Sequence, residues 1–294
     1  MKGILIVNEF LRTNKFKEIH SWLQEAASKH GIELEIRSNA EMLAVIGEDA
    51  AKTDTEADFI LFLDKDTRLA FYLEQLGYQV FNSSRAIGIC DDKAMTHLIL
   101  MNSGIRMPET LIAPFTFENI GYTNYNFLNK VAGRLGFPLI VKECFGSFGQ
   151  QVYLINSYDE LLAKMRNIGP KPVIFQRFIK SSFGRDIRLQ VVGDKVIAAM
   201  YRYSDKGDFR ANLTNGAKMK SYIPTDRQCE LALKACKLIG LDFAGVDILF
   251  GENDEPLVCE VNSNAHFKNI YDCTGVNVAD AIIEHILSRM KGKI

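Results

Sequence analysis

Short apolar runs alternate with longer stretches of helical periodicity through the first ninety residues, and this alternation limits the fold more than any other feature. A short apolar run bounded by polar segments predicts a buried strand, and strand–helix–strand order predicts a parallel sheet covered by helices. In chain order, these runs and helical stretches lie at 4–7, 16–30, 34–36, 59–63, 67–76 and 80–81. Residues 1–90 are therefore expected to form a small α/β domain with a parallel sheet.

Two short motifs refine this expectation. Asn82-Ser83-Ser84 can cap the next helix, because short polar side chains accept hydrogen bonds from the first backbone N–H groups of a helix. Asn8-Glu9-Phe10 follows the first strand, where a dinucleotide-binding domain would carry G-x-G-x-x-G. We therefore do not expect this domain to bind NAD.

Charge and composition exclude several classes of protein. The 35 Lys and Arg side chains balance 36 Asp and Glu side chains, so no overall field draws the chain to nucleic acid or to an anionic membrane. No apolar run approaches the ~18 residues that a membrane span needs. The six cysteines stand singly, without the spacing of a zinc site. We expect a cytoplasmic protein with reduced cysteines that binds neither nucleic acid nor membranes.

The pattern changes from α/β to α+β after Pro108. The strands expected at 137–144 and 150–155 are joined by a glycine-containing loop instead of a helix, which predicts an antiparallel sheet. Further expected elements are a helix at 159–166, a strand at 173–179, a hairpin at 186–203, a helix at 226–239, a hairpin at 243–262 and a helix at 276–290. We expect two α+β units, over residues 91–180 and 181–294.

The hairpin at 243–262 carries the sharpest functional signal. Symmetric pairing about its turn places Asp247 opposite Glu260, with Asn262 on the same face and Cys259 on the other. Opposed like charges destabilise a ladder, so this trio of oxygen ligands in an apolar hairpin predicts a site for Mg²⁺ or Mn²⁺. The alternative is a solvent-facing acidic stripe.

Lys142 ends an apolar strand and is followed by the glycine-containing loop 143–149. Backbone N–H groups of such a loop and a nearby ammonium group can bind phosphate oxygens. The loop lacks the G-x-x-x-x-G-K-[ST] spacing and joins two strands, so a nucleotide would lie between two sheets. The alternative for Lys142 is an edge-strand gatekeeper. Lys93, after Asp91-Asp92, can equally be an exposed lysine near a helix start.

Asp186, Arg188 and Arg202 lie on the two arms of the hairpin at 186–203. A strict two-residue turn would put the two arginines on opposite faces, so either a bulge intervenes or only one of them serves a site. The loop at 206–212 adds three charges and an amide, which suits either closure over a polyphosphate or a solvated turn.

Several of these motifs together resemble an ATP-grasp enzyme of the RimK type, which includes the alpha-L-glutamate ligases. The motifs are Asp91-Asp92-Lys93, Pro138 to Lys142, Gly184 to Arg188, Gly207 to Asn212, Gly245-Val246-Asp247 and Glu260-Val261-Asn262. The resemblance runs from about Asp91 to the C-terminus. It implies an ATP-grasp fold, in which a central subdomain over 91–180 and a C-terminal subdomain over 181–294 clamp ATP behind a small domain over 1–90.

The resemblance also implies a role for each candidate site residue. Nucleotide contacts would come from Lys93 and Lys142 on the phosphates, Gln176, Arg177, Phe178 and Ile179 along the adenine, Asp186 on the ribose, and Arg210, Ala211 and Asn212. Two Mg²⁺ or Mn²⁺ ions would be held by Asp247, Glu260 and Asn262. Arg202, with Arg188, would stabilise an oxyanion during catalysis.

Three departures from the family pattern qualify this resemblance. The loop at 145–151 is poorer in glycine than usual, Arg177 stands where an acidic residue is common, and 263–267 replaces a run of small residues with proline and glycine. The last change lies where an acceptor could bind. It therefore bears more on whether this chain shares the family's specificity for glutamate than on whether it uses ATP.

The resemblance implies a carboxylate–amine ligase. ATP would phosphorylate a carboxylate, and an amine would attack the acyl phosphate to give an amide, with glutamate as one candidate substrate and an amino acid, peptide or protein tail as acceptor. Two alternatives are a kinase on the same scaffold and an ATP-binding interaction module without catalysis. Whether the chain forms a homo-oligomer is left open.

Overall fold

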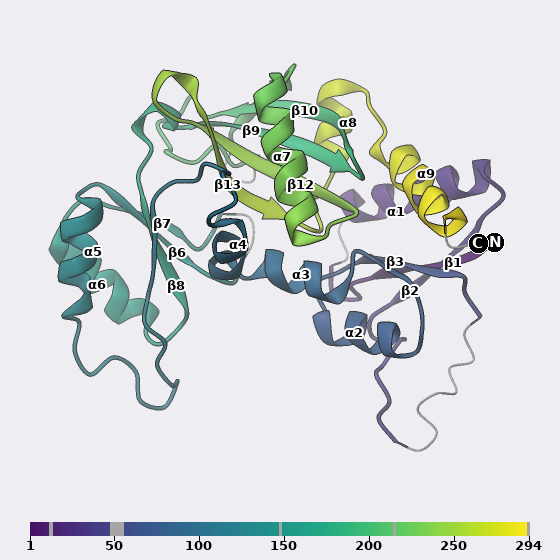
Figure 1. Cartoon of the computed structure of the whole chain (residues 1–294), viewed down its shortest axis with the longest axis horizontal. Helices are drawn as coiled ribbons and strands as arrows, with labels where there is room; N and C mark the ends of the chain where they lie inside the picture. Colours follow the sequence, from purple (N-terminus) through teal and green to yellow (C-terminus); the bar gives the residue numbers. More distant parts are fainter. Residues whose placement is uncertain (12–13, 48–55, 147–148, 214–215, 293–294) are drawn as a thin grey trace.

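The computed structural model describes residues 1–292 except 12–13, 48–55, 147–148 and 214–215. Its strands form three sheets. Figure 1 shows the N-terminal sheet at one end of the molecule, a second sheet with α5 and α6 at the other end, and a third sheet between and above them. The predicted combination of α/β and α+β parts is confirmed.

The N-terminal sheet is parallel and has the order β2-β1-β3-β4. Its elements are β1 (Lys2–Val7), α1 (Asn14–Lys29), β2 (Glu33–Ser38), β3 (Phe59–Leu63), α2 (Thr67–Gln75), β4 (Val80–Phe81) and α3 (Ser84–Asp91). The middle strands β1 and β3 are almost fully apolar because both of their faces are buried. The side chain of Ser83 accepts a hydrogen bond from the Ala86 N–H and caps α3, as predicted.

The central sheet is antiparallel and has the order β5-β8-β6-β7. Its elements are α4 (Lys93–Leu100), β5 (Thr110–Ile112), α5 (Phe127–Leu135), β6 (Leu139–Glu143), β7 (Val152–Ile155), α6 (Tyr158–Ile168) and β8 (Val173–Arg177). The helices α5 and α6 bury apolar side chains against one face of this sheet. The opposite face is therefore the one that can meet the rest of the chain.

The third sheet is also antiparallel, with the order β11-β10-β9-β12-β13. Its elements are η1 (Lys180–Ser182), β9 (Arg185–Val192), β10 (Lys195–Tyr203), β11 (Lys218–Ser221), α7 (Asp226–Ile239), β12 (Phe243–Phe250), η3 (Glu252–Asp254), β13 (Pro256–Asn262), α8 (Lys268–Thr274) and α9 (Val278–Lys291). A capping box of Thr225 and Gln228 fixes the start of α7 at the predicted residue.

The last two helices tie the third sheet to the N-terminal domain. Apolar residues of α8 and α9, such as Ile270 and Ile282, share one core with Leu23 of α1 and with Phe243 of β12. The N-terminal sheet is therefore packed against the C-terminal part of the chain through α1. The residue ranges proposed for the three domains stay predictions.

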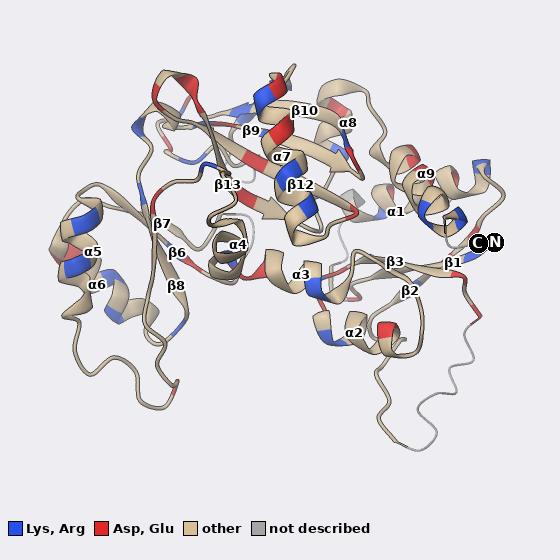
Figure 2. Cartoon of the chain, in the orientation of Figure 1, with Lys and Arg blue, Asp and Glu red and all other residues tan. Residues whose placement is uncertain are grey.

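Charge is mixed over the surface, as composition indicated. Figure 2 shows basic and acidic residues interspersed along α7 and α9. All six cysteines are free thiols. Among the described residues, no helix has both the length and the apolar character needed to cross a membrane.

Candidate active site

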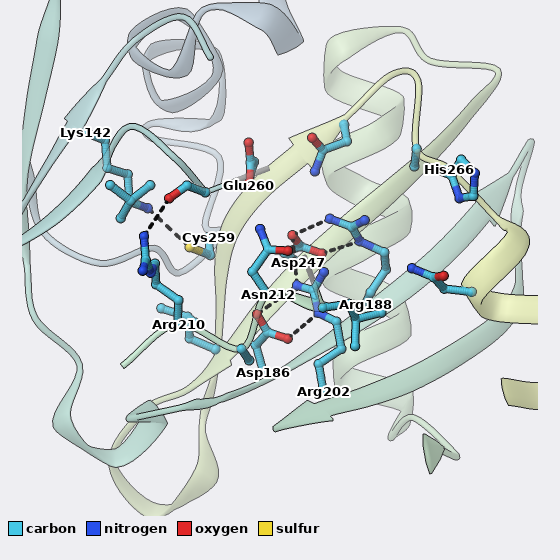
Figure 3. Close-up of a pocket in the computed structure, with 18 of the residues that line it drawn as sticks. Lys142, Asp186, Arg188, Arg202, Arg210, Asn212, Asp247, Cys259, Glu260 and His266 are labelled. Atoms are coloured by element: carbon cyan, nitrogen blue, oxygen red, sulfur yellow. Dashed lines mark hydrogen bonds and ion pairs between the residues drawn. The ribbon is translucent and has the colours of Figure 1, made fainter. Parts of the chain in front are cut away.

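A cavity of about 490 Å³ lies where the three sheets meet. Its walls include Lys142 of β6, Arg188 of β9, Arg202 of β10, Asp247 of β12 and Asp64, which follows β3. Figure 3 shows several of these side chains converging from different strands. A cavity of this size can enclose a small-molecule ligand.

A bulge in β10 brings both predicted arginines to this cavity. The register between β9 and β10 shifts between Val196 and Ala198, so that Arg202 lies opposite Asp186 and Met200 lies opposite Arg188. The extra residue moves Arg202 onto the face of Arg188. The sequence left two alternatives, a bulge or only one arginine at the site, and the bulge is correct.

The two arginines form a buried network with two aspartates. Arg202 donates to both oxygens of Asp186 at 2.7 Å, and Arg188 donates to both oxygens of Asp247 at 2.7 Å. Arg202 Nη2 also lies 3.1 Å from Asp247 Oδ2, which links the two pairs into one chain (Figure 3). Acid and base alternate along this chain, so the four buried charges compensate one another.

Burial affects the two aspartates differently, because at Asp186 it outweighs the attraction of Arg202 and raises the pKa of this carboxyl. Burial alone would raise the pKa of Asp247, but the positive charges of Arg188 and Arg202 outweigh burial and hold this pKa below its ordinary value. Bidentate bonding also fixes the orientation of each guanidinium group. The site thus holds two arginines in place before any ligand enters.

A second bulge changes the face of Cys259. Asp247 pairs with Glu260 and Gly245 pairs with Asn262, as predicted, but the register shifts after Asp247 and leaves Cys259 as an extra residue. The prediction that Cys259 points away from the acidic residues is therefore wrong. Its Sγ lies 3.4 Å from Lys142 Nζ, and both side chains line the cavity.

Glu260 and Asn262 both line the cavity, whereas Asp247 turns toward the arginines. The nearest basic group that pairs with Glu260 is Lys93, whose Nζ lies 3.8 Å from Glu260 Oε1. Lys93 also donates to the carbonyl of Gly146 at 3.2 Å, and Gly146 belongs to the glycine-containing loop. Lys93 does not itself line the cavity in the described part of the chain.

The loop at 206–212 reaches the glycine-containing loop. Arg210 pairs with Asp208 and donates from Nη1 to the carbonyl of Gly149 at 3.0 Å. Arg210, Ala211 and Asn212 line the cavity, as does Gly149. Ser147 and Phe148, which belong to the predicted phosphate-binding loop, lie outside the described residues.

The segment from Gln176 to Ile179 forms another wall of the cavity. The side chain of Gln176 is buried and bonds to Thr110 Oγ1 at 3.0 Å, and Arg177 reaches away to pair with Glu109. The side chains of these two residues are thus engaged elsewhere. Phe178 and Ile179 also line this wall, and the contact of the segment with adenine stays a prediction.

Reasoning from sequence missed the contribution of the N-terminal domain. Asn8, Leu11, Phe16 and Asp64 all line the cavity, although no site residue was predicted in this domain. One signal could have found two of them, because Asn8 follows β1 and Asp64 follows β3. These strands are adjacent and parallel, and ligands commonly bind outside the carboxyl ends of such strands.

A family model describing the RimK-like ATP-grasp domain matches residues 90–286. The chain belongs to this family. The resemblance to RimK-type ligases and the expected ATP-grasp ligase class are thereby confirmed. The match covers the central and third sheets, which hold Lys142, the arginine network and Glu260.

This RimK-like protein is similar in sequence to two curated relatives and similar in fold to one solved structure. An uncharacterized protein of Mycoplasma pneumoniae is 33% identical over 267 residues, which cover 90% of the chain and 91% of that protein. A ribosomal protein bS6–L-glutamate ligase of Escherichia fergusonii is 37% identical over 216 residues, covering 72% of the chain and 69% of the ligase.

The solved structure is a D-alanine–D-alanine ligase of Bacillus anthracis complexed with ATP. It superimposes with a TM-score of 0.73 at 20% identity, and the likeness covers all of both chains. At this identity the likeness shows the fold alone. The ATP-grasp fold predicted for the RimK-like chain is therefore confirmed, including the small domain that precedes it.

Proposed function

We propose that this RimK-like protein uses ATP to join a carboxylate to an amine through an acyl phosphate. The observation that carries the proposal is the cavity between the sheets, which is lined by Lys142, Arg188, Arg202 and Arg210 together with Glu260. Phosphoryl transfer needs positioning and neutralisation of charge more than a nucleophilic side chain. The cavity supplies several fixed positive charges for this purpose.

Each group in the cavity has a role in the proposed reaction. Lys142 and Arg210 bind the phosphates, while the backbone at 177–179 lies along the adenine. The γ-phosphoryl group passes to the substrate carboxylate, which gives ADP and an acyl phosphate. The ammonium group of the amine loses a proton to solvent, and the neutral amine attacks the acyl carbon. Arg202 stabilises the negative oxygen until inorganic phosphate leaves and the nitrogen releases a second proton to give the amide. Arg202 suits this role because Asp186 holds its guanidinium group in place.

Enzymes of the ATP-grasp fold use divalent cations with ATP, and two residues of this chain fit such an ion. Asn262 has a buried Nδ2 atom without a hydrogen-bond partner among the described residues. Turning the amide would present its oxygen at this place, next to Glu260 on the same strand. We propose that Glu260 and Asn262 hold Mg²⁺ or Mn²⁺, joined by Asp247, and that the ions neutralise phosphate charge.

The acid and the amine are proposed by analogy with the relatives. The Escherichia fergusonii relative is a glutamate ligase by name, so glutamate is the first substrate to test. The acceptor is an amino acid, a peptide or a protein tail. Residues 263–267 differ from the family pattern, and three of them, Asn264 to His266, line the cavity. This segment is where acceptor choice can differ from that of the relatives.

The proposal is tested by screening acids and amines for stimulated release of ADP and phosphate. A ligase releases phosphate only when an acid and an amine are both present, and the product has the mass of the amide. A kinase would leave a stable phosphorylated product without phosphate release. A silent module would bind ATP and release nothing, and either of these results would overturn the proposal.

Replacing Lys142 with Met is expected to weaken ATP binding about tenfold or more, because a hydrogen bond to a charged group contributes roughly 1.5–3 kcal/mol. Methionine keeps the length of the side chain but removes its charge. Lys171→Met is the matched control, since Lys171 is 63% exposed and pairs with Glu143 of the same strand β6. Calorimetric titration with ATP measures both variants. Equal affinity in the two would show that Lys142 does not bind the phosphates; the edge-strand alternative is already excluded, because β6 lies between β8 and β7.

A further inference from the structure

A buried carboxylate lines the cavity outside the group of residues that bind nucleotide in the proposed function. Asp64 follows β3 and is 5% exposed. It accepts hydrogen bonds from Asn8 Nδ2 at 3.1 Å to each of its oxygens and from the Lys65 backbone N–H at 2.7 Å. These donors leave lone pairs of the carboxylate unused, since an ionised carboxylate offers about four acceptor positions.

The only cation that acts on Asp64 among the described residues is the adjacent Lys65, and its effect is weak beside that of burial. Among the residues that the structure describes, no Lys, Arg or His side chain forms an ion pair with it. The ammonium group of the adjacent Lys65 lies 2.5 Å from Asp91 Oδ1 instead. Burial raises the pKa of Asp64, and its hydrogen bonds oppose this only in part. A buried carboxylate without a cation is costly, so the site favours a ligand that brings one.

The opposite sign prevails where the nucleotide is proposed to bind. Lys142 and Arg210 project into the cavity there, and both are suited to phosphate. The other cavity carboxylates, Asp186, Asp247 and Glu260, each pair with a lysine or an arginine. Among the described residues, Asp64 forms no such pair, so this carboxylate attracts a cationic second substrate and not the anionic nucleotide.

The surroundings of Asp64 suit an organic amine better than a metal ion. Leu11 and Phe16 add apolar walls to the cavity, and the ring of Phe16 meets the ring of His266 edge-on at 5.2 Å. The polar groups that contact Asp64 are the Asn8 amide nitrogen and the Lys65 backbone N–H, which are donors and cannot ligate a metal ion. An ammonium group on a carbon skeleton would satisfy both the carboxylate and the apolar walls.

We infer that Asp64 binds the ammonium group of the amine substrate. The inference rests on the proposed function, which requires an amine, and it adds the residue and the charge state by which that amine is recognised. Asn8 orients the carboxylate. A primary amine with a free ammonium group binds, whereas its N-acetylated form does not. The N-terminal domain, which lies outside the matched residues 90–286, thus selects the acceptor.

The test compares wild type with Asp64→Asn, which keeps the shape of the side chain and removes its charge. The probes are the twenty amino acids, ethanolamine and glycinamide, with the N-acetylated form of each amine that binds. Calorimetry is expected to show at least one amine binding to wild type and a loss of roughly tenfold or more in Asp64→Asn, since charged hydrogen bonds are the strong ones. The affinity for ATP is expected to change less than twofold.

A merely structural role for Asp64 predicts a different result. Removing an unpaired buried charge is expected to leave the melting temperature equal or higher, whereas loss of a structural contact would lower it. Asp58→Asn is the matched control, because Asp58 precedes the same strand β3 and bonds to the Lys2 N–H away from the cavity. This control is expected to bind amines and ATP like wild type.

Failure of this inference can be separated from failure of the proposed function. Hydroxylamine is uncharged at neutral pH and intercepts an acyl phosphate, so Asp64→Asn is expected to keep forming hydroxamate from ATP and the acid. Absence of hydroxamate with wild type for every acid would overturn the ligase proposal. If no amine of the panel binds wild type, or if Asp64→Asn binds amines equally well, Asp64 is not the ammonium site.

Discussion

Replacing Glu260 with Gln is expected to lower ATP turnover at least ~10²-fold, which is the scale seen when one preorganised charge-stabilising group is removed from an active site. Glu260 lines the cavity beside Lys142 and is the carboxylate of the proposed ion site that the arginine network leaves accessible. Glutamine keeps the shape but binds Mg²⁺ more weakly. Steady-state ADP release at increasing Mg²⁺ concentration measures the effect, and the concentration for half-maximal rate is expected to rise.

Glu252→Gln serves as the control for this variant. Glu252 is exposed at the turn of the same hairpin, in η3, so it loses the same charge away from the cavity. It is expected to turn over ATP like wild type, and both variants are expected to melt like wild type. Full activity of Glu260→Gln would remove Glu260 from the metal site.

Replacing Arg202 with Met is expected to lower the free energy of unfolding by about 3–5 kcal/mol, because it leaves buried carboxylates without their cation. Arg202 is 7% exposed and contacts both Asp186 and Asp247. Turnover is expected to fall ~10³-fold as well, since an arginine that stabilises a transition state has effects of this size. Urea denaturation and ADP release measure the two effects separately.

The double variant Asp186→Asn with Arg202→Met distinguishes stability from catalysis. Removing one negative charge is expected to recover part of the lost stability, while turnover stays low because no guanidinium group returns. For stability, the matched control is Arg185→Met on the neighbouring strand β9, whose partner Asp254 is 68% exposed. A surface pair of this kind contributes less than ~1 kcal/mol. If the double variant regains activity, Arg202 is structural only.

The elements with strong local signals could be predicted from the sequence. The helix at 226–239 and the pairing of Asp247 with Glu260 both agree with the structure, because a cap and a symmetric hairpin are encoded by neighbouring residues. By contrast, β5 was not predicted. It has only three residues of mixed exposure, so it carries no clear local signal. It is a strand because it pairs with β8, which lies more than sixty residues further along the chain.

The sequence by itself determined the family, the change from an α/β to an α+β pattern and the acidic and basic residues that the chain can bring to a nucleotide. Only the tertiary structure decided which of these residues face one another. One extra residue in β10 turns Arg202 toward Arg188, and one in β13 turns Cys259 toward Lys142. Side chains alternate with a period of two along a strand, so an unpaired residue reverses every face beyond it. The tertiary structure also decided that Asp64 lines the cavity. Packing of α1 against α9 brings the N-terminal sheet, which is distant in sequence, to the site.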